Sequence, residues 1–131
     1  MALSATIEQN ILNHFLGVSS YTFVGTIYMA LFTTTPTMPA GTGGVEVSGG
    51  AYARQSTAFS VSGSGPAVAQ NSGLVQFPTA TANWGTIVGA GLYTALSGGT
   101  LIDAGNLVTS KVIGTGDTFA MPSGNYTINQ Q

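Results

Sequence analysis

The chain has 131 residues, of which 44% are hydrophobic and 5% are charged, and its formal net charge is −2. The hydrophobic fraction is ordinary for a globular domain, whereas charged residues usually make up about 25% of a soluble protein. With two basic residues, the chain lacks the positive surface that binds nucleic acid or an anionic membrane. Its apolar runs are far shorter than the roughly 20 residues of a membrane-spanning helix. Without cysteine, thiolate chemistry and disulfides are excluded.

The first predicted element is an amphipathic α-helix over residues 4–16. Ser4 is a suitable N-cap, Glu8 lies near the positive end of the helix, and Gly17 is a natural residue to end it. The apolar residues recur at helical spacing, at Leu3, Ile7, Ile11 and Phe15, with Leu12 and Leu16 widening the stripe. We also expect no signal peptide, because this segment has no basic beginning.

After Gly17 the apolar period changes to two, and Gly, Pro, Ser and Thr recur between short runs. This pattern predicts strands at residues 26–33, 53–59, 73–77, 86–93, 99–103, 106–108, 111–113, 118–121 and 126–128. The predicted fold is mainly β: a single antiparallel β-sandwich domain over residues 1–131, jelly-roll-like, with one N-terminal α-helix.

The strand at residues 26–33 has two apolar faces. Ile27, Met29 and Leu31 lie on one face, and the residues between them on the other, so we expect a central strand covered on both sides. Pro36 cannot donate a ladder hydrogen bond, which is why the strand ends before it.

Two segments lack a periodic apolar pattern, and both are predicted to be long surface loops. They are residues 39–50, which are rich in glycine, and residues 60–71. Gly98 and Gly99 indicate the turn of a hairpin that begins near Tyr93.

No set of residues has the spacing of a catalytic or metal site. His14 lacks a carboxylate partner on its own face of the helix, and the four acidic residues are far apart in the sequence. A pair of carboxylates assembled across the fold, as in a glycosidase, stays open, but nothing in the sequence requires it. Gly41–Gly44 lacks the lysine and the helix of a phosphate loop. We therefore predict no catalytic, cofactor-binding or metal-binding residue, and a protein that is not an enzyme.

Four residues are candidates for contacts with another molecule: Tyr52, Arg54, Gln55 and Trp84. Tyr52 and Arg54 are two positions apart and share one face of a strand start, where the arginine either caps a turn over an aromatic ring or bridges to another subunit. Trp84 is more typical of packing at a strand end than of a sugar-stacking platform.

Several stretches of the chain occur in the order found in a family of small tailed-bacteriophage virion proteins. The family pattern has an N-terminal helix, a strand ending in LALFTT, GG-x-YARQ, FPTATA-x-WGT, a hairpin with a GG turn and a terminal TSK…SGDT. The chain has MALFTTTPT, EVSGGAYARQ, VQFPTATANWGT, SGGTLIDAGNL and TSKVIGTGDTFAMPSGNYTI. It departs from the pattern at Thr35, where members often have Asp, and after WGT, where Gly91 to Thr94 replace the usual hairpin. The chain therefore resembles this family over nearly its whole length.

The resemblance implies a non-enzymatic structural protein of the virion, assembled in the host cytoplasm. Members are commonly labelled tail-fibre proteins, and others of similar size are capsid decoration or cement proteins. A tail fibre that grips a host usually needs length or a dedicated receptor module, and the chain has neither. We therefore expect a head decoration protein that contacts the major capsid protein or other virion proteins. The alternatives are a tail fibre or tail-tip protein and a glycan-binding module, with Trp84, Tyr52 or Tyr93 as the stacking platform.

We also expect a homo-oligomer, with a trimer favoured, and no nucleic-acid or membrane partner. Low charge removes the repulsion between identical surfaces. The predicted contacts are the loop at residues 36–50 and the strand start at residues 52–55, or alternatively the N-terminal helix.

Overall fold

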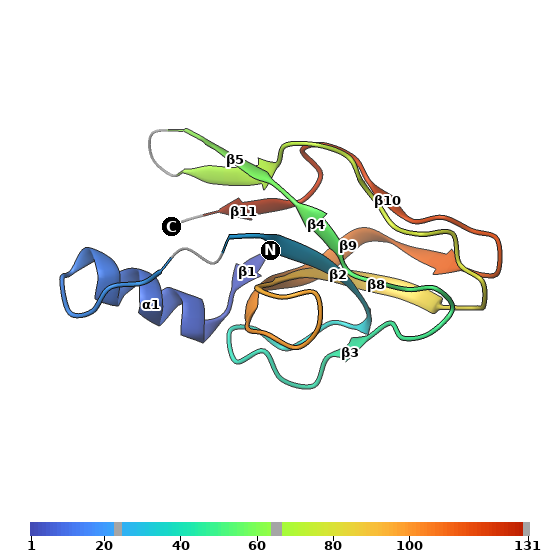
Figure 1. Cartoon of the computed structure of the whole chain (residues 1–131), viewed down its shortest axis with the longest axis horizontal. Helices are drawn as coiled ribbons and strands as arrows, with labels where there is room; N and C mark the ends of the chain where they lie inside the picture. The colour runs from blue at the N-terminus through green and yellow to red at the C-terminus, as the bar shows by residue number, and fades with distance from the viewer. Residues whose placement is uncertain (23–24, 64–66, 130–131) are drawn as a thin grey trace.

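The computed structural model describes residues 1–22, 25–63 and 67–129, and its elements are shown in Figure 1. The larger layer is an antiparallel sheet that contains six strands in these described residues. They are β1 (Ala2–Leu3), β2 (Ile27–Thr34), β3 (Val45–Glu46), β4 (Gln55–Thr57), β8 (Gly85–Tyr93) and β9 (Leu101–Ile113). Their order is β1-β9-β8-β2-β3, and β4 also pairs with β2.

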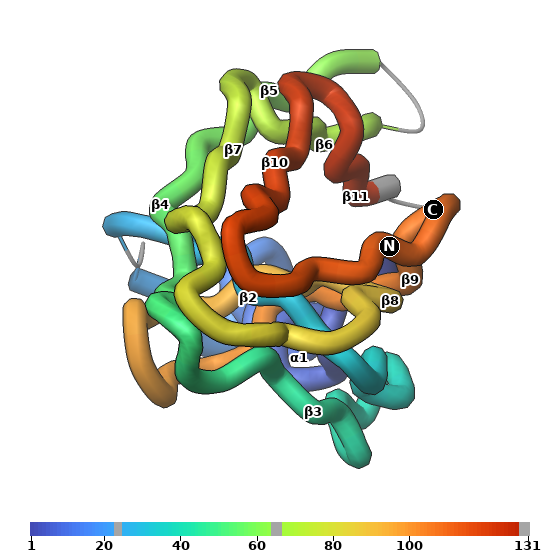
Figure 2. Tube along the Cα trace, turned by 90° about the vertical axis from the view of Figure 1, so that its right-hand side faces the viewer, coloured from blue at the N-terminus to red at the C-terminus, as the bar shows by residue number. Residues whose placement is uncertain are grey.

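The second layer consists of two smaller antiparallel sheets. One has the order β11-β6-β5 and the other pairs β10 with β7. The strands are β5 (Phe59–Ser62), β6 (Val68–Asn71), β7 (Val75–Gln76), β10 (Ala120–Met121) and β11 (Thr127–Asn129). Figure 2 shows this layer above β2, β8 and β9. The structure thus confirms a mainly β, sandwich-like arrangement of antiparallel sheets.

Strand β2 lies at the centre of the molecule and is buried on both faces, as predicted. Met29 and Leu31 point into the core between the layers, and Ala30 and Phe32 pack on the opposite face against Ala104. All five residues are at most 1% exposed. The opposite face is covered because Met38, Tyr93 and Leu101 pack over it.

The core between the layers is rich in aromatic residues. Phe77 and Phe119 meet edge to face with ring centroids 5.8 Å apart, and Phe59 meets Tyr126 in the same way at 5.8 Å. Such pairs add to the stabilisation that comes from burying apolar surface. These contacts lie within the second layer, where they join the segment after β7 to the segment before β10, and β5 to the segment before β11.

The predicted helix is present as α1 (Ala5–Phe15). The Ser4 hydroxyl accepts a hydrogen bond from the Ile7 amide at 3.4 Å, and Gly17 after the helix has φ of 74°, so both predicted ends are confirmed. Of the eleven residues of α1, however, Ile7 alone is buried. The helix projects at one end of the molecule (Figure 1), and most of its apolar stripe does not reach the core.

Several predicted boundaries were wrong. Residues 60–71 were expected to form a loop, but β5 and β6 form an antiparallel pair there, for example Val61 with Ala69, while residues 64–66 of this segment lie outside the described residues. The strand predicted at residues 53–59 is divided into β4 and β5, which pair with different sheets. The loop predicted at residues 39–50 contains β3, which pairs with β2. The physical reason is that these strands have only two to four residues, too few for an apolar pattern to define them, so they depend on their partners.

The three strands predicted between residues 99 and 113 form one strand, β9. Its pairing with β8 shifts between Gly89–Asn106 and Ile87–Lys111, so that residues 107–110 lie opposite Val88 alone. This bulge directs Val108 entirely into solvent. Gly98 and Gly99 both have positive φ in the connection between β8 and β9, which confirms the predicted turn.

Candidate functional site

Arg54 lies just before β4 and joins segments that are distant in the sequence. Its Nε and Nη2 donate to the two carboxylate oxygens of Glu46 at 2.9 and 2.8 Å. Its Nη1 donates to the carbonyl oxygens of Ala95 and Gly98 at 2.9 and 2.8 Å. The guanidinium carbon lies 3.7 Å from the centre of the Tyr93 ring. Arg54 therefore connects β3 and the loop that follows β8.

Tyr52 connects this ion pair to the core. Its hydroxyl donates to Glu46 Oε2 at 2.7 Å and accepts from the Leu31 amide at 3.0 Å. Its ring stacks on Phe77 with centroids 6.1 Å apart and meets the edge of Trp84 at 5.4 Å. The polar end of Tyr52 therefore stabilises Glu46, while its ring belongs to the aromatic core.

Trp84 precedes β8 and is 5% exposed. Its Nε1 donates to the carbonyl oxygen of Gly50 at 2.8 Å. Gly50 has φ of 59°, and a Cβ atom there would lie 2.8 Å from Trp84 Nε1, so a side chain would disturb this contact. Trp84 therefore packs at a strand end, and its buried ring offers no face on which a sugar stacks.

The electrostatics of this cluster favour a structural role. Hydrogen bonding to Glu46 raises the pKa of Arg54, so the guanidinium stays charged. Burial raises the pKa of Tyr52 well above its usual value, so its hydroxyl stays protonated. The ion pair is internally neutralised, and neither of these two groups exchanges protons near neutral pH. The cluster is thus suited to holding loops together.

A groove of about 450 Å³ lies beside the cluster, lined by residues 46–49, 52–54 and 96–98. The structure thus brings Tyr52, Arg54 and Trp84 together, whereas the Gln55 side chain stays local. Its Nε2 donates to the carbonyl oxygens of Ala53 and Arg54 at 2.8 and 3.2 Å. The four hydrogen bonds of Arg54 match the first alternative raised by the sequence, a turn-capping arginine over an aromatic ring. Contact of these residues with another subunit stays a prediction.

Sequence reasoning missed a second polar site, formed by Asp103 and Tyr126. Both side chains are fully buried, and the Tyr126 hydroxyl donates to Asp103 Oδ1 at 2.7 Å. Asp103 Oδ2 has no hydrogen-bond partner among the described residues. Burial raises the pKa of Asp103 to about 6, against the opposing effects of the Tyr126 hydrogen bond and the N-terminal charge. An aspartate inside the apolar run Leu101-Ile102-Asp103-Ala104 was the available signal.

The remaining candidates for chemistry are separate. Asp117 Oδ2 accepts from the Gly114 amide at 2.9 Å, as expected of a turn, and His14 Nδ1 accepts from the Tyr21 amide at 3.2 Å. Within residues 1–22, 25–63 and 67–129, no group of three or more His, Cys, Asp and Glu side chains is close enough to hold a metal ion. None of the helices in the same residues is long and apolar enough to cross a membrane.

Comparison with protein families connects this architecture to bacteriophage virions. Residues 2–129 match the model of a family described as "Podophage GP4 fiber I protein gp80". A search of curated proteins finds no match. The family match covers all the described strands and α1. The chain therefore belongs to the podophage GP4 fiber I protein gp80 family, a family of phage virion proteins.

Proposed function

We propose that this protein is a structural subunit of a podophage tail fibre. The observation that carries the proposal is the match of residues 2–129 to a family whose description names a fibre protein. We favour the fibre over the head decoration role expected from the sequence, because that expectation rested only on the shortness of the chain and the lack of a dedicated receptor module, whereas the family description names a fibre. The proposed role is mechanical and requires no catalytic group.

Features of the fold support a mechanical role. The Arg54 cluster fixes the loop that follows β8 to β3, so the surface near β3 is held in one conformation. With 5% charged residues, the protein presents a nearly neutral surface to its neighbours, and assembly of identical copies meets little electrostatic repulsion.

The proposed partners are other copies of the chain and neighbouring virion proteins. We favour a trimer, with residues 36–50 and 52–55 among the contacts. These segments border the groove beside Arg54, and the glycines of the first segment let a neighbouring backbone approach closely.

The test is to locate the protein on purified virions. Gold-labelled antibodies raised against it are imaged by electron microscopy, and its copies per virion are counted by quantitative mass spectrometry. Label on the tail with a small copy number supports the fibre. Label over the whole head with hundreds of copies contradicts it and restores the decoration role. Virions that contain no copy contradict both.

A further inference from the structure

The exposed face of α1 is the first of two complementary surfaces. Leu12, Phe15 and Leu16 are exposed by 59%, 80% and 74%, although they lie within an apolar stripe. Glu8 is exposed on the same face, one turn before Leu12. The stripe lies away from the core because α1 is attached near its start, where the amides of Ser4 and Ala5 bond to Ile102 and Pro39 carbonyls.

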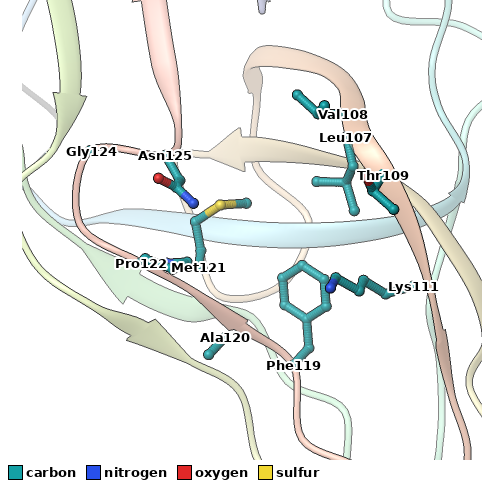
Figure 3. Close-up of a pocket in the computed structure, with 10 residues that line it drawn as sticks. All are labelled: Leu107, Val108, Thr109, Lys111, Phe119, Ala120, Met121, Pro122, Gly124 and Asn125. Atoms are coloured by element: carbon teal, nitrogen blue, oxygen red, sulfur yellow. The ribbon is translucent and has the colours of Figure 1, made fainter.

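The second surface is a groove of about 550 Å³ between the bulge of β9 and residues 119–125. Figure 3 shows Leu107 and Met121 pointing toward one another across it, with Phe119 beside Lys111 and Val108 at the bend of β9. Lys111 lies along the same groove and is exposed. The groove therefore combines an apolar lining with a single positive charge.

Charge links these two surfaces. The ion pair that forms among the described residues is Arg54–Glu46, so Glu8 and Lys111 have no charged partner within residues 1–22, 25–63 and 67–129. Lys111 is the sole lysine of the sequence. A helix face that has an acid one turn before its apolar anchors is complementary to an apolar groove that has a lysine beside it. Binding of an amphipathic helix in an apolar groove is a common mode of protein recognition.

We propose that α1 of one copy binds in the groove between β9 and residues 119–125 of a second copy, with Glu8 paired to Lys111. Leu12, Phe15 and Leu16 enter the groove beside Leu107 and Met121. The helix and β10 lie toward opposite ends of the long axis (Figure 1), so the contact joins copies head to tail. A head-to-tail contact closes into a ring or continues as a filament. The inference goes beyond the proposed function and does not depend on it.

The first experiment measures self-association of the purified protein by sedimentation velocity over a range of concentrations. The wild type is expected to associate, and Phe15→Gln and Val108→Gln are each expected to abolish association over that range. Val61→Gln, the same replacement at an exposed valine of β5, is the matched control and should associate as the wild type does. Circular dichroism confirms that each variant is folded.

A mixture of these two variants distinguishes binding of α1 in the groove from an alternative in which the helices of two copies pack on each other. The Phe15→Gln protein keeps an intact groove and the Val108→Gln protein keeps an intact helix, so an equal mixture is expected to form dimers that contain one copy of each variant.

The ion pair between Glu8 and Lys111 is tested separately. Glu8→Gln and Lys111→Gln should each weaken association about two- to five-fold, and the double variant no more than either alone.

Three outcomes would overturn the proposal. They are a wild-type protein that stays monomeric throughout, association that survives Val108→Gln, and a mixture that stays monomeric. These measurements use purified protein, so their failure is distinct from absence of the protein from the tail in the labelling experiment.

Discussion

Glu46 and Asp103 both lie on strands of the main sheet, but their carboxylates have different surroundings. Glu46 accepts two hydrogen bonds from Arg54 and one from Tyr52, and its side chain keeps some contact with solvent. Asp103 is fully buried, and among the described residues it accepts from Tyr126 alone. The comparison shows that a carboxylate inside a fold stays charged when it is paired with a cation. A buried carboxylate without such a partner has a raised pKa, and the stability of the fold then depends on pH.

Among the predicted changes in the free energy of unfolding, removing Arg54, the partner of Glu46, should have the largest effect. Arg54→Ala is expected to lower the free energy of unfolding by about 3–5 kcal/mol, since Glu46 loses a bidentate partner and two carbonyls lose their donor. Urea denaturation at pH 7 measures it. Lys111→Ala, at the other basic residue, is the control and should change stability by less than about 0.5 kcal/mol. A loss for Arg54→Ala as small as that of the control would show that the ion pair does not hold the loops.

Titration of Asp103 should give the next largest effect. Its pKa is 3.8 ordinarily and about 6 in the fold, so between these values the folded state binds more protons than the unfolded state. The free energy of unfolding due to Asp103 therefore rises as the pH falls from above 6 to about 4. This rise in the pKa of Asp103 corresponds to a change of at most about 3 kcal/mol in the free energy of unfolding.

Asp103→Asn tests this linkage because the amide keeps the shape of the side chain and does not titrate. We expect the wild type to gain stability relative to Asp103→Asn as the pH falls from 7 to 4. Urea midpoints measured at several pH values provide the comparison, and the titration of the other acids is common to both proteins. Parallel curves for the two proteins across this window would refute a raised pKa for Asp103.

Removing the hydroxyl of Tyr126 should lower the free energy of unfolding by less than the two changes above. Tyr126→Phe leaves Asp103 without its hydrogen bond and is expected to cost about 1–3 kcal/mol at pH 7. The cost should be smaller at pH 5, since a protonated carboxyl group is less costly to leave unpaired. Thermal unfolding at both pH values measures it, with Tyr21→Phe, at an exposed tyrosine, as the control. An equal cost at both pH values would argue against this coupling.

Parts of the fold were predictable where the signal is local. The ends of α1 follow from Ser4 and Gly17, and the central position of β2 follows from apolar residues on both of its faces. The pair of β5 and β6 was not predictable, because these short strands are defined by their pairing with each other and with β11. The bulge of β9 was missed because it is a property of the register with β8.

The candidate site also contains residues that have a local sequence signal and residues that do not. Tyr52, Arg54 and Trp84 could be selected from the sequence because Tyr, Arg and Trp are often used in contacts. The partners of Arg54 could not be selected in this way. Glu46 lies within a glycine-rich segment, and Ala95 and Gly98 contribute only backbone carbonyls. Asp103 and Tyr126 are 23 positions apart, and nothing in either neighbourhood indicates the other.

The sequence by itself determined the class of fold, the N-terminal helix and the scarcity of charge, since periodicity, capping residues and composition can be read without knowing which distant segments meet. The tertiary structure decided which charges are paired, which apolar residues of α1 remain exposed and where β9 bulges. These features depend on contacts between segments far apart in the chain, and such contacts form only when the two layers pack together.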